Sequence, residues 1–109
     1  MHKVYVKTYE DAVVRFNKYH PEVKGDLLYV GVTASTMEQR NKLDLEWATE
    51  SKWKSRAQAI LNCKKMTVKI LAEFSSREEA EAFESKMIAC GVRRYGCHKE
   101  GGLMLNIKP

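Results

Sequence analysis

The sequence lacks long hydrophobic runs and contains little proline, glycine or cysteine. No stretch of about 18 apolar residues occurs in the 109-residue chain, so we expect no membrane-spanning helix. The only prolines are Pro21 and Pro109, and no Pro-, Gly- or Ser-rich segment divides the chain, which predicts a single domain over residues 1–109. The three cysteines cannot all pair within one chain, and charged residues closely follow the N-terminal methionine. We therefore expect a cytoplasmic protein with reduced thiols and no signal peptide.

Positive charge is in excess, because 19 Lys and Arg residues stand against 14 Asp and Glu residues and give a net charge of +5. A basic domain attracts polyanions, most often nucleic acid. Trp47 and Trp53 lie near one run of basic residues. Stacking on a base is one interpretation, but we expect both indoles in the hydrophobic core. Six basic side chains are candidates for nucleic-acid binding: Lys52, Lys54, Arg56, Arg93, Arg94 and Lys99.

The first third of the chain predicts a strand, a helix and a second strand. Residues 3–7 alternate and favour β structure. Thr8 and Asp11 are typical of a helix start, and the expected helix runs on to the neighbourhood of Pro21. Residues 27–32 form an apolar run that predicts a buried strand.

The remaining elements are marked by capping boxes, apolar spacing and glycine. Ser35 to Glu38 is a capping box, and the helix that it opens is expected to run to about Ala48. Further elements are expected as a helix over 53–61, a strand over 64–74, and a helix that a second capping box at Ser76 to Glu79 opens and Gly91 ends. A short apolar segment at 103–107 follows. The chain therefore predicts an α/β (α+β) fold with a small, mostly antiparallel sheet flanked by helices.

Arg40 falls on the apolar side of its expected helix. A helical wheel places Met37, Leu43 and Trp47 on one stripe and puts Arg40 inside it. An inward-facing charge costs free energy unless it is paired or lines a cavity. Arg40 therefore either pairs with Asp44 one turn later or belongs to a functional site.

Glu84 likewise falls on the apolar side of its expected helix, the one that the capping box at Ser76 opens. It shares a face with Ala80, Phe83 and Met87, unlike the neighbouring glutamates. A carboxylate there either pairs with a buried cation such as Arg40 or holds a metal ion.

Four short motifs occur in one order along the chain. Tyr29-Val30-Gly31 lies on the expected strand over 27–32, and Arg40 follows nine residues after the glycine. Glu84 precedes Ile88 by four positions, and Leu105-Asn106-Ile107 follows. In this order and spacing the sequence resembles the GIY-YIG nuclease family. The first family motif has no full counterpart: Lys3-Val4-Tyr5 keeps only the tyrosine.

The resemblance implies hydrolysis of DNA phosphodiester bonds with Mg²⁺ or Mn²⁺. Glu84 would hold the metal, Arg40 would bind the scissile phosphate, Tyr5 or Tyr29 would orient or deprotonate water, and Asn106 would organise the site. Gly31, in the strand motif, is a further candidate near the nucleic acid. A domain this small implies targeting by dimerisation or by a partner protein, as in stand-alone enzymes of phage or mobile-element type.

A second hypothesis keeps the fold without the chemistry. Asp44 stands where many members of the family carry a histidine or tyrosine that assists the reaction, and Lys3 stands where they carry glycine. The chain would then be a nucleic-acid-binding module or an inhibitor of another protein.

Overall fold

A three-stranded antiparallel sheet forms the middle layer of the computed structural model, which describes residues 1–15 and 22–106. The strands are β1 (His2–Val14), β2 (Val23–Thr33) and β3 (Lys65–Phe74), and β1 lies between the other two. The antiparallel sheet with flanking helices confirms the predicted fold class.

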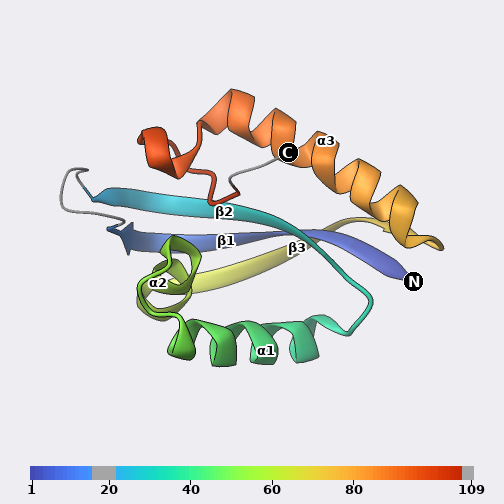
Figure 1. Cartoon of the computed structure of the whole chain (residues 1–109), viewed down its shortest axis with the longest axis horizontal. Helices are drawn as coiled ribbons and strands as arrows, with labels where there is room; N and C mark the ends of the chain where they lie inside the picture. The colour runs from blue at the N-terminus through green and yellow to red at the C-terminus, as the bar shows by residue number, and fades with distance from the viewer. Residues whose placement is uncertain (16–21, 107–109) are drawn as a thin grey trace.

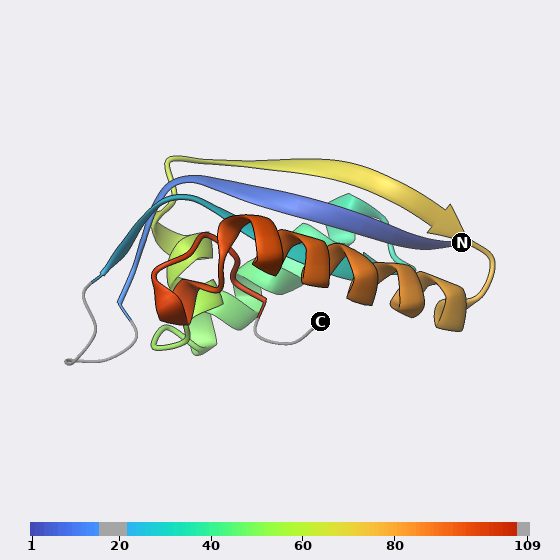
Figure 2. The same ribbon diagram turned by 90° about the horizontal axis from the view of Figure 1, so that it is seen from above.

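Helices cover both faces of this sheet. Figure 1 shows α3 (Arg77–Tyr95) on one side and α1 (Met37–Glu50) and α2 (Ser55–Asn62) on the other, and Figure 2 shows α3 running lengthwise along the sheet. A short 3₁₀ helix, η1 (His98–Glu100), follows α3. Within the part of the chain that the structure describes, no helix is long and apolar enough to cross a membrane.

Two hydrophobic clusters hold the layers together, one on each face of the sheet. On the α3 side, Val4 and Val30 pack with Ala80 and Ile88. On the α2 side, buried strand residues pack with Ala59; these are Tyr9, Ala12, Val14, Val23 and Leu27. Because successive side chains in a strand point to opposite faces, neighbouring residues of β1 and β2 contribute to different clusters.

The helix predicted from Thr8 onwards is wrong, because β1 continues to Val14. The register shifts between Tyr9 and Ala12, where Asp11 has a φ of 51° and its N–H donates to the Asp26 carboxylate at 3.1 Å. A bulge thus replaces the expected helix start, since pairing with two neighbouring strands outweighs a local capping signal. The rest of that prediction, residues 16–21, lies outside the described residues.

The start of α1 is shifted by one residue from its prediction. Thr36 is the N-cap, its hydroxyl accepts from the Gln39 N–H, and the Gln39 side chain accepts from the Thr36 N–H. Ser76 is the N-cap of α3, as expected, and of the predicted capping box the structure shows the Ser76 hydroxyl accepting from the Glu79 N–H at 3.1 Å. The strand expected over 64–74 agrees with the structure to within one residue.

The prediction that Gly91 ends α3 is wrong, because the helix continues to Tyr95. A Cβ at Gly91 would lie 2.6 Å from the methyl carbon of Met104. Gly91 therefore lets the C-terminal segment approach the helix closely.

The segment after η1 lies against the outer edge of β2. The Leu28 N–H donates to the Leu103 carbonyl at 2.9 Å, and the Leu105 N–H donates to the Leu28 carbonyl at 2.8 Å. Leu28 and Met104 form a parallel bridge. The apolar segment predicted at 103–107 thus partly covers this edge, and its residue 107 lies outside the described residues.

Candidate functional site

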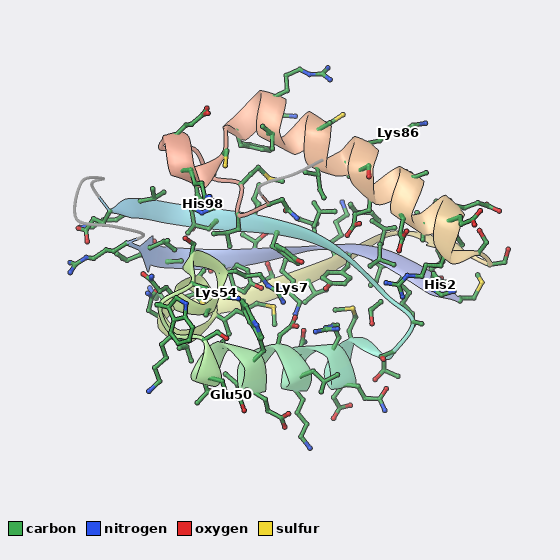
Figure 3. All side chains as sticks on the ribbon, viewed as in Figure 1. His2, Lys7, Glu50, Lys54, Lys86 and His98 are labelled. Atoms are coloured by element: carbon green, nitrogen blue, oxygen red, sulfur yellow. The ribbon has the colours of Figure 1, made fainter. Side chains whose placement is uncertain are left out.

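Three cationic side chains surround the carboxylate of Asp44 between the sheet and α1. Lys7 Nζ lies 2.7 Å from Asp44 Oδ2, while Arg40 Nη2 and Arg56 Nη2 lie 2.6 and 2.9 Å from Oδ1. Asp44 is only 2% exposed. Figure 3 shows Lys7 in the space between the sheet and α1. We call Lys7, Arg40, Asp44 and Arg56 the Asp44 cluster.

The fold brings these four residues together from three elements. Lys7 lies on β1 on the same face as Tyr5 and Tyr9, because strand side chains alternate. Arg40 and Asp44 are one turn apart on α1, and Arg56 lies in the first turn of α2. Lys7 was not among the residues predicted from the sequence, although a lysine between two tyrosines on one face of a strand was a signal for it.

The cluster carries an excess of positive charge. Burial by itself would raise the pKa of Asp44, but hydrogen bonds from Lys7 and Arg40 and the charge of Arg56 outweigh it, so the pKa is lowered and the group is ionised at neutral pH. Burial lowers the pKa of Lys7 in spite of the Asp44 contact. Three cationic groups facing one carboxylate make a site suited to an anion.

Tyr5, Gly31 and Tyr29 meet beside this cluster. Tyr5 and Gly31 are partners in the β1–β2 register. A Cβ at Gly31 would lie 2.5 Å from the Tyr5 hydroxyl oxygen and 3.1 Å from the Tyr29 ring, so only glycine leaves room for both phenol groups. Arg56 lies 4.2 Å from the centre of the Tyr29 ring, and its Nη1 is 3.3 Å from the Tyr29 hydroxyl.

The two tyrosines differ in their suitability as a base. Tyr5 is buried, and burial together with the charge of Asp44 raises the pKa of its phenol well above the ordinary value. It therefore remains a neutral hydrogen-bonding group at physiological pH. Tyr29 is only half-buried and its hydroxyl contacts Arg56.

The predicted pairing of Arg40 with Asp44 is present, and Tyr5 and Tyr29 lie near enough to Arg40 to interact with its charge. Its side chain is 33% exposed, so part of the guanidinium faces solvent. The predicted apolar stripe is wrong at Leu43, which is 49% exposed. The inner side of α1 consists instead of Asp44 and Ala48.

Both the oxygen and the nitrogen of the Asn106 side-chain amide form hydrogen bonds with the backbone of Val30. Oδ1 accepts from the Val30 N–H, and Nδ2 donates to the Val30 carbonyl, both at 2.9 Å. Because Val30 stands between Tyr29 and Gly31, Asn106 fixes the strand that carries the tyrosine site. The asparagine thus acts on the site through the backbone.

Glu84 lies on α3, on the other side of the sheet from α1 (Figure 1). It is half-buried and makes no hydrogen bond or ion pair with any other described residue. Burial and the nearby charge of Glu81 raise its pKa, and Arg77 partly opposes them. Glu84 therefore does not form the ion pair with Arg40 that was one of its two predicted roles.

A free carboxylate suits Mg²⁺, which often takes one or two protein oxygens and keeps several waters. Glu84 fits such a ligand because no described Lys, Arg or His forms an ion pair with it. Asp44 does not fit, since its oxygens are occupied by cations. Among residues 1–15 and 22–106, no three His, Cys, Asp or Glu side chains gather around a common metal position.

The basic residues expected to contact nucleic acid divide between the two sides of the sheet. Lys54, Arg56 and Lys99 line one hollow of about 610 Å³ next to Tyr29. Lys52 is exposed in the turn between α1 and α2. Arg93 and Arg94 lie exposed on the last turn of α3.

The expectation that both tryptophans lie in the core is wrong for Trp53. Its side chain, in the turn before α2, is 72% exposed, whereas Trp47 is half-buried. Arg56 lies 4.6 Å from the centre of the Trp47 ring, so its guanidinium contacts both Trp47 and Tyr29.

Comparison with known proteins gave no match: no protein-family model, no curated protein and no solved structure matches the chain.

Proposed function

We propose that this protein is a small DNA endonuclease that binds a phosphodiester at the Asp44 cluster and hydrolyses it. The supporting observation is that Tyr5 and Tyr29 meet at Gly31 and interact electrostatically with Arg40, one of the three cationic side chains around Asp44. The GIY-YIG resemblance had singled out the same three residues for this chemistry.

Arg40 and Arg56 are the groups that would hold the phosphate. Both contact Asp44 Oδ1, and their side chains remain 33% and 22% exposed. A guanidinium has five N–H donors, so the Asp44 contacts leave donors for a second anion. Asp44 holds both guanidinium groups in place, so a phosphate would bind to positive charges that are already positioned.

We assign to Tyr29 the role of orienting or deprotonating the attacking water. Its hydroxyl is held near Arg56, next to the place where the phosphate would bind. Tyr5, whose phenol stays protonated, would donate a hydrogen bond to a phosphate oxygen. Lys7 is fully buried and acts by holding Asp44.

A bound Mg²⁺ or Mn²⁺ would supply Lewis-acid stabilisation of charge on phosphoryl oxygens. The resemblance assigns this ion to Glu84, but an ion held there would lie on the α3 side of the sheet, away from a phosphate at the Asp44 cluster. Since α3 lies across the sheet from α1, we assign the phosphate contacts to the arginines alone.

A second candidate function is DNA binding without cleavage. The specific observation in its favour is Asp44, which occupies the position where the resemblance leads one to expect a histidine or tyrosine. With hydrogen bonds from Lys7 and Arg40 and a lowered pKa, Asp44 is a poor proton acceptor. Binding would then use the same arginines.

Nicking of supercoiled plasmid DNA tests the proposal. Wild type and the variants Arg40→Ala, Tyr29→Phe and Glu84→Gln are incubated at low salt with Mg²⁺, with Mn²⁺, or with EDTA. Lys86→Ala, an exposed lysine change on α3, serves as the control. Urea unfolding of every variant checks that the fold is retained.

The proposal predicts nicking by wild type and by Lys86→Ala that requires a divalent metal, and a loss of at least 100-fold in Arg40→Ala and Tyr29→Phe. Glu84→Gln tests whether a metal on the α3 side of the sheet contributes, and a phosphate held by the arginines alone predicts no such loss. Absence of nicking by wild type together with a gel shift that depends on Arg40 would replace it with the binding function. Neither nicking nor a gel shift would overturn both.

A further inference from the structure

A hollow beside the Asp44 cluster combines aromatic rings with positive charge. It has a volume of about 610 Å³, and Trp47, Trp53, Lys54, Arg56 and Lys99 are among its lining residues. Tyr29 lines it as well, so the hollow adjoins the place assigned to the phosphate. Figure 3 labels Lys54 and His98, two of the lining residues, at the same end of the molecule.

The aromatic surface here is open to a ligand. Trp53 is 72% exposed, the highest exposure among the tryptophans, tyrosines and phenylalanines of the described residues. Trp47, which lines the same hollow, is contacted by Arg56 at 4.6 Å and by Lys54 at 5.9 Å from its ring centre. One indole is thus fixed in place and the other is exposed beside it.

The charge of the hollow selects the ligand. Lys54, Arg56 and Lys99 contribute positive charge, and no Asp or Glu is among the lining residues. A ligand that satisfies both features is anionic and has a flat aromatic face. A nucleotide has both, whereas an acidic peptide supplies only the charge.

We propose that the hollow binds an unpaired nucleotide, with its base against Trp53 and the adjoining phosphate at the Asp44 cluster. The inference rests on the proposed function and names its substrate class: DNA with a single-stranded segment, such as a fork, a flap or a free strand. A base inside an intact duplex has both faces covered by its neighbours and cannot stack on an indole.

Tryptophan fluorescence tests this directly, because Trp47 and Trp53 are the only two tryptophans in the chain. Trp47→Phe reports on Trp53 alone, and Trp53→Phe reports on Trp47 alone. Each is titrated at low salt, with EDTA to prevent cleavage, with a 15-nucleotide oligo(dT), with a 15-base-pair duplex and with polyglutamate. Affinity for oligo(dT) is also measured for Trp53→Ala and for Leu45→Ala, an exposed apolar control on α1.

The inference predicts strong quenching of Trp53 by oligo(dT), about tenfold weaker binding of the duplex, and about tenfold weaker oligo(dT) binding by Trp53→Ala than by Leu45→Ala. Equal affinity of Trp53→Ala and wild type for oligo(dT), equal affinity for the duplex, or equal quenching by polyglutamate would overturn it. These results are separable from plasmid nicking. Quenching without nicking would refute only the proposed cleavage. Nicking by wild type together with unchanged oligo(dT) binding by Trp53→Ala would refute only the nucleotide site.

Discussion

The ammonium of Lys7 on β1 lies 2.7 Å from the carboxylate of Asp44 on α1, and both side chains are almost completely buried. The pair links the central strand to a helix that otherwise makes few contacts with the sheet. Arg40 and Arg56 complete the set of charges around the same carboxylate. Asp44 is thus both a connection between two layers and the anchor of the proposed phosphate site.

Removing the Asp44 charge should destabilise the protein strongly. Asp44→Asn leaves three cationic side chains facing a neutral amide, and we expect a loss of about 3 kcal/mol in the free energy of unfolding at pH 7. Lys7→Met should cost less, because Asp44 keeps two guanidinium partners. Urea unfolding measures both.

The Asp44→Asn effect should depend on pH. The folded-state pKa of Asp44 is lowered, so its contribution is fully present above the unfolded value of about 3.9 and is lost as the pH falls through the folded value. The two unfolding curves should therefore converge only in strong acid. A difference under 0.5 kcal/mol at pH 7, roughly the size of an ordinary surface substitution, would contradict this account.

Glu84→Gln should raise stability at neutral pH. The folded-state pKa of Glu84 is raised, so ionisation opposes folding, and this cost appears as the pH rises above the unfolded value of about 4.3. Because Glu84 is only half-buried, we expect a gain on the order of 0.5 kcal/mol at pH 7 and none at pH 3.5. Glu79→Gln, in the exposed first turn of α3, is the control and should show no gain.

Asn106→Ala should cost about 2–3 kcal/mol, because it leaves the buried N–H and carbonyl of Val30 without partners. Asn62 offers a matched control, since its amide makes the same two hydrogen bonds with the Val13 backbone at an exposed position. Water can replace Asn62, so Asn62→Ala should cost less than 1 kcal/mol. Equal losses in the two variants, measured by urea unfolding, would refute the backbone role of Asn106.

Gly31→Ala should disturb the tyrosine site. The new Cβ would lie 2.5 Å from the hydroxyl oxygen and 2.6 Å from the Cζ of Tyr5, a buried ring with little room to move. We expect a loss of about 1–3 kcal/mol in stability and a loss of nicking. Gly91→Ala is the control: its Cβ meets the flexible end of Met104 and gains helix propensity, so its cost should be smaller. Wild-type nicking by Gly31→Ala would show that the two phenol groups need not be held together.

The sequence predicted the sheet class, the capped start of α3 and the inward position of Arg40, because these depend on local spacing. The full length of β1 was not predictable from local spacing: Thr8 and Asp11 carry real helix-start signals, and only pairing with β2 and β3 decides against them. Gly91 likewise has the local signature of a helix end, while its actual role depends on Met104.

The candidate site was predictable only in part, for the same reason. Tyr5, Tyr29 and Arg40 were found from motif spacing, and the Arg40–Asp44 pair from helix geometry. Lys7 was missed because its partner is 37 positions away, on a different element. Trp53 was misplaced because hydrophobicity predicts burial on average, whereas the exposure of one indole in a turn depends on the whole fold.

The most direct test of the central claim, that Arg40 and Arg56 bind the DNA phosphate, is the affinity for labelled forked DNA across a salt series. The double variant Arg40→Gln/Arg56→Gln is compared with Lys42→Gln/Lys86→Gln, which removes the same charge from exposed sites on α1 and α3. We predict at least tenfold weaker binding and a salt slope smaller by about 2 for the arginine variant, beyond any effect of the lysine variant. Equal affinities and slopes for the two variants, with both folded, would contradict the account.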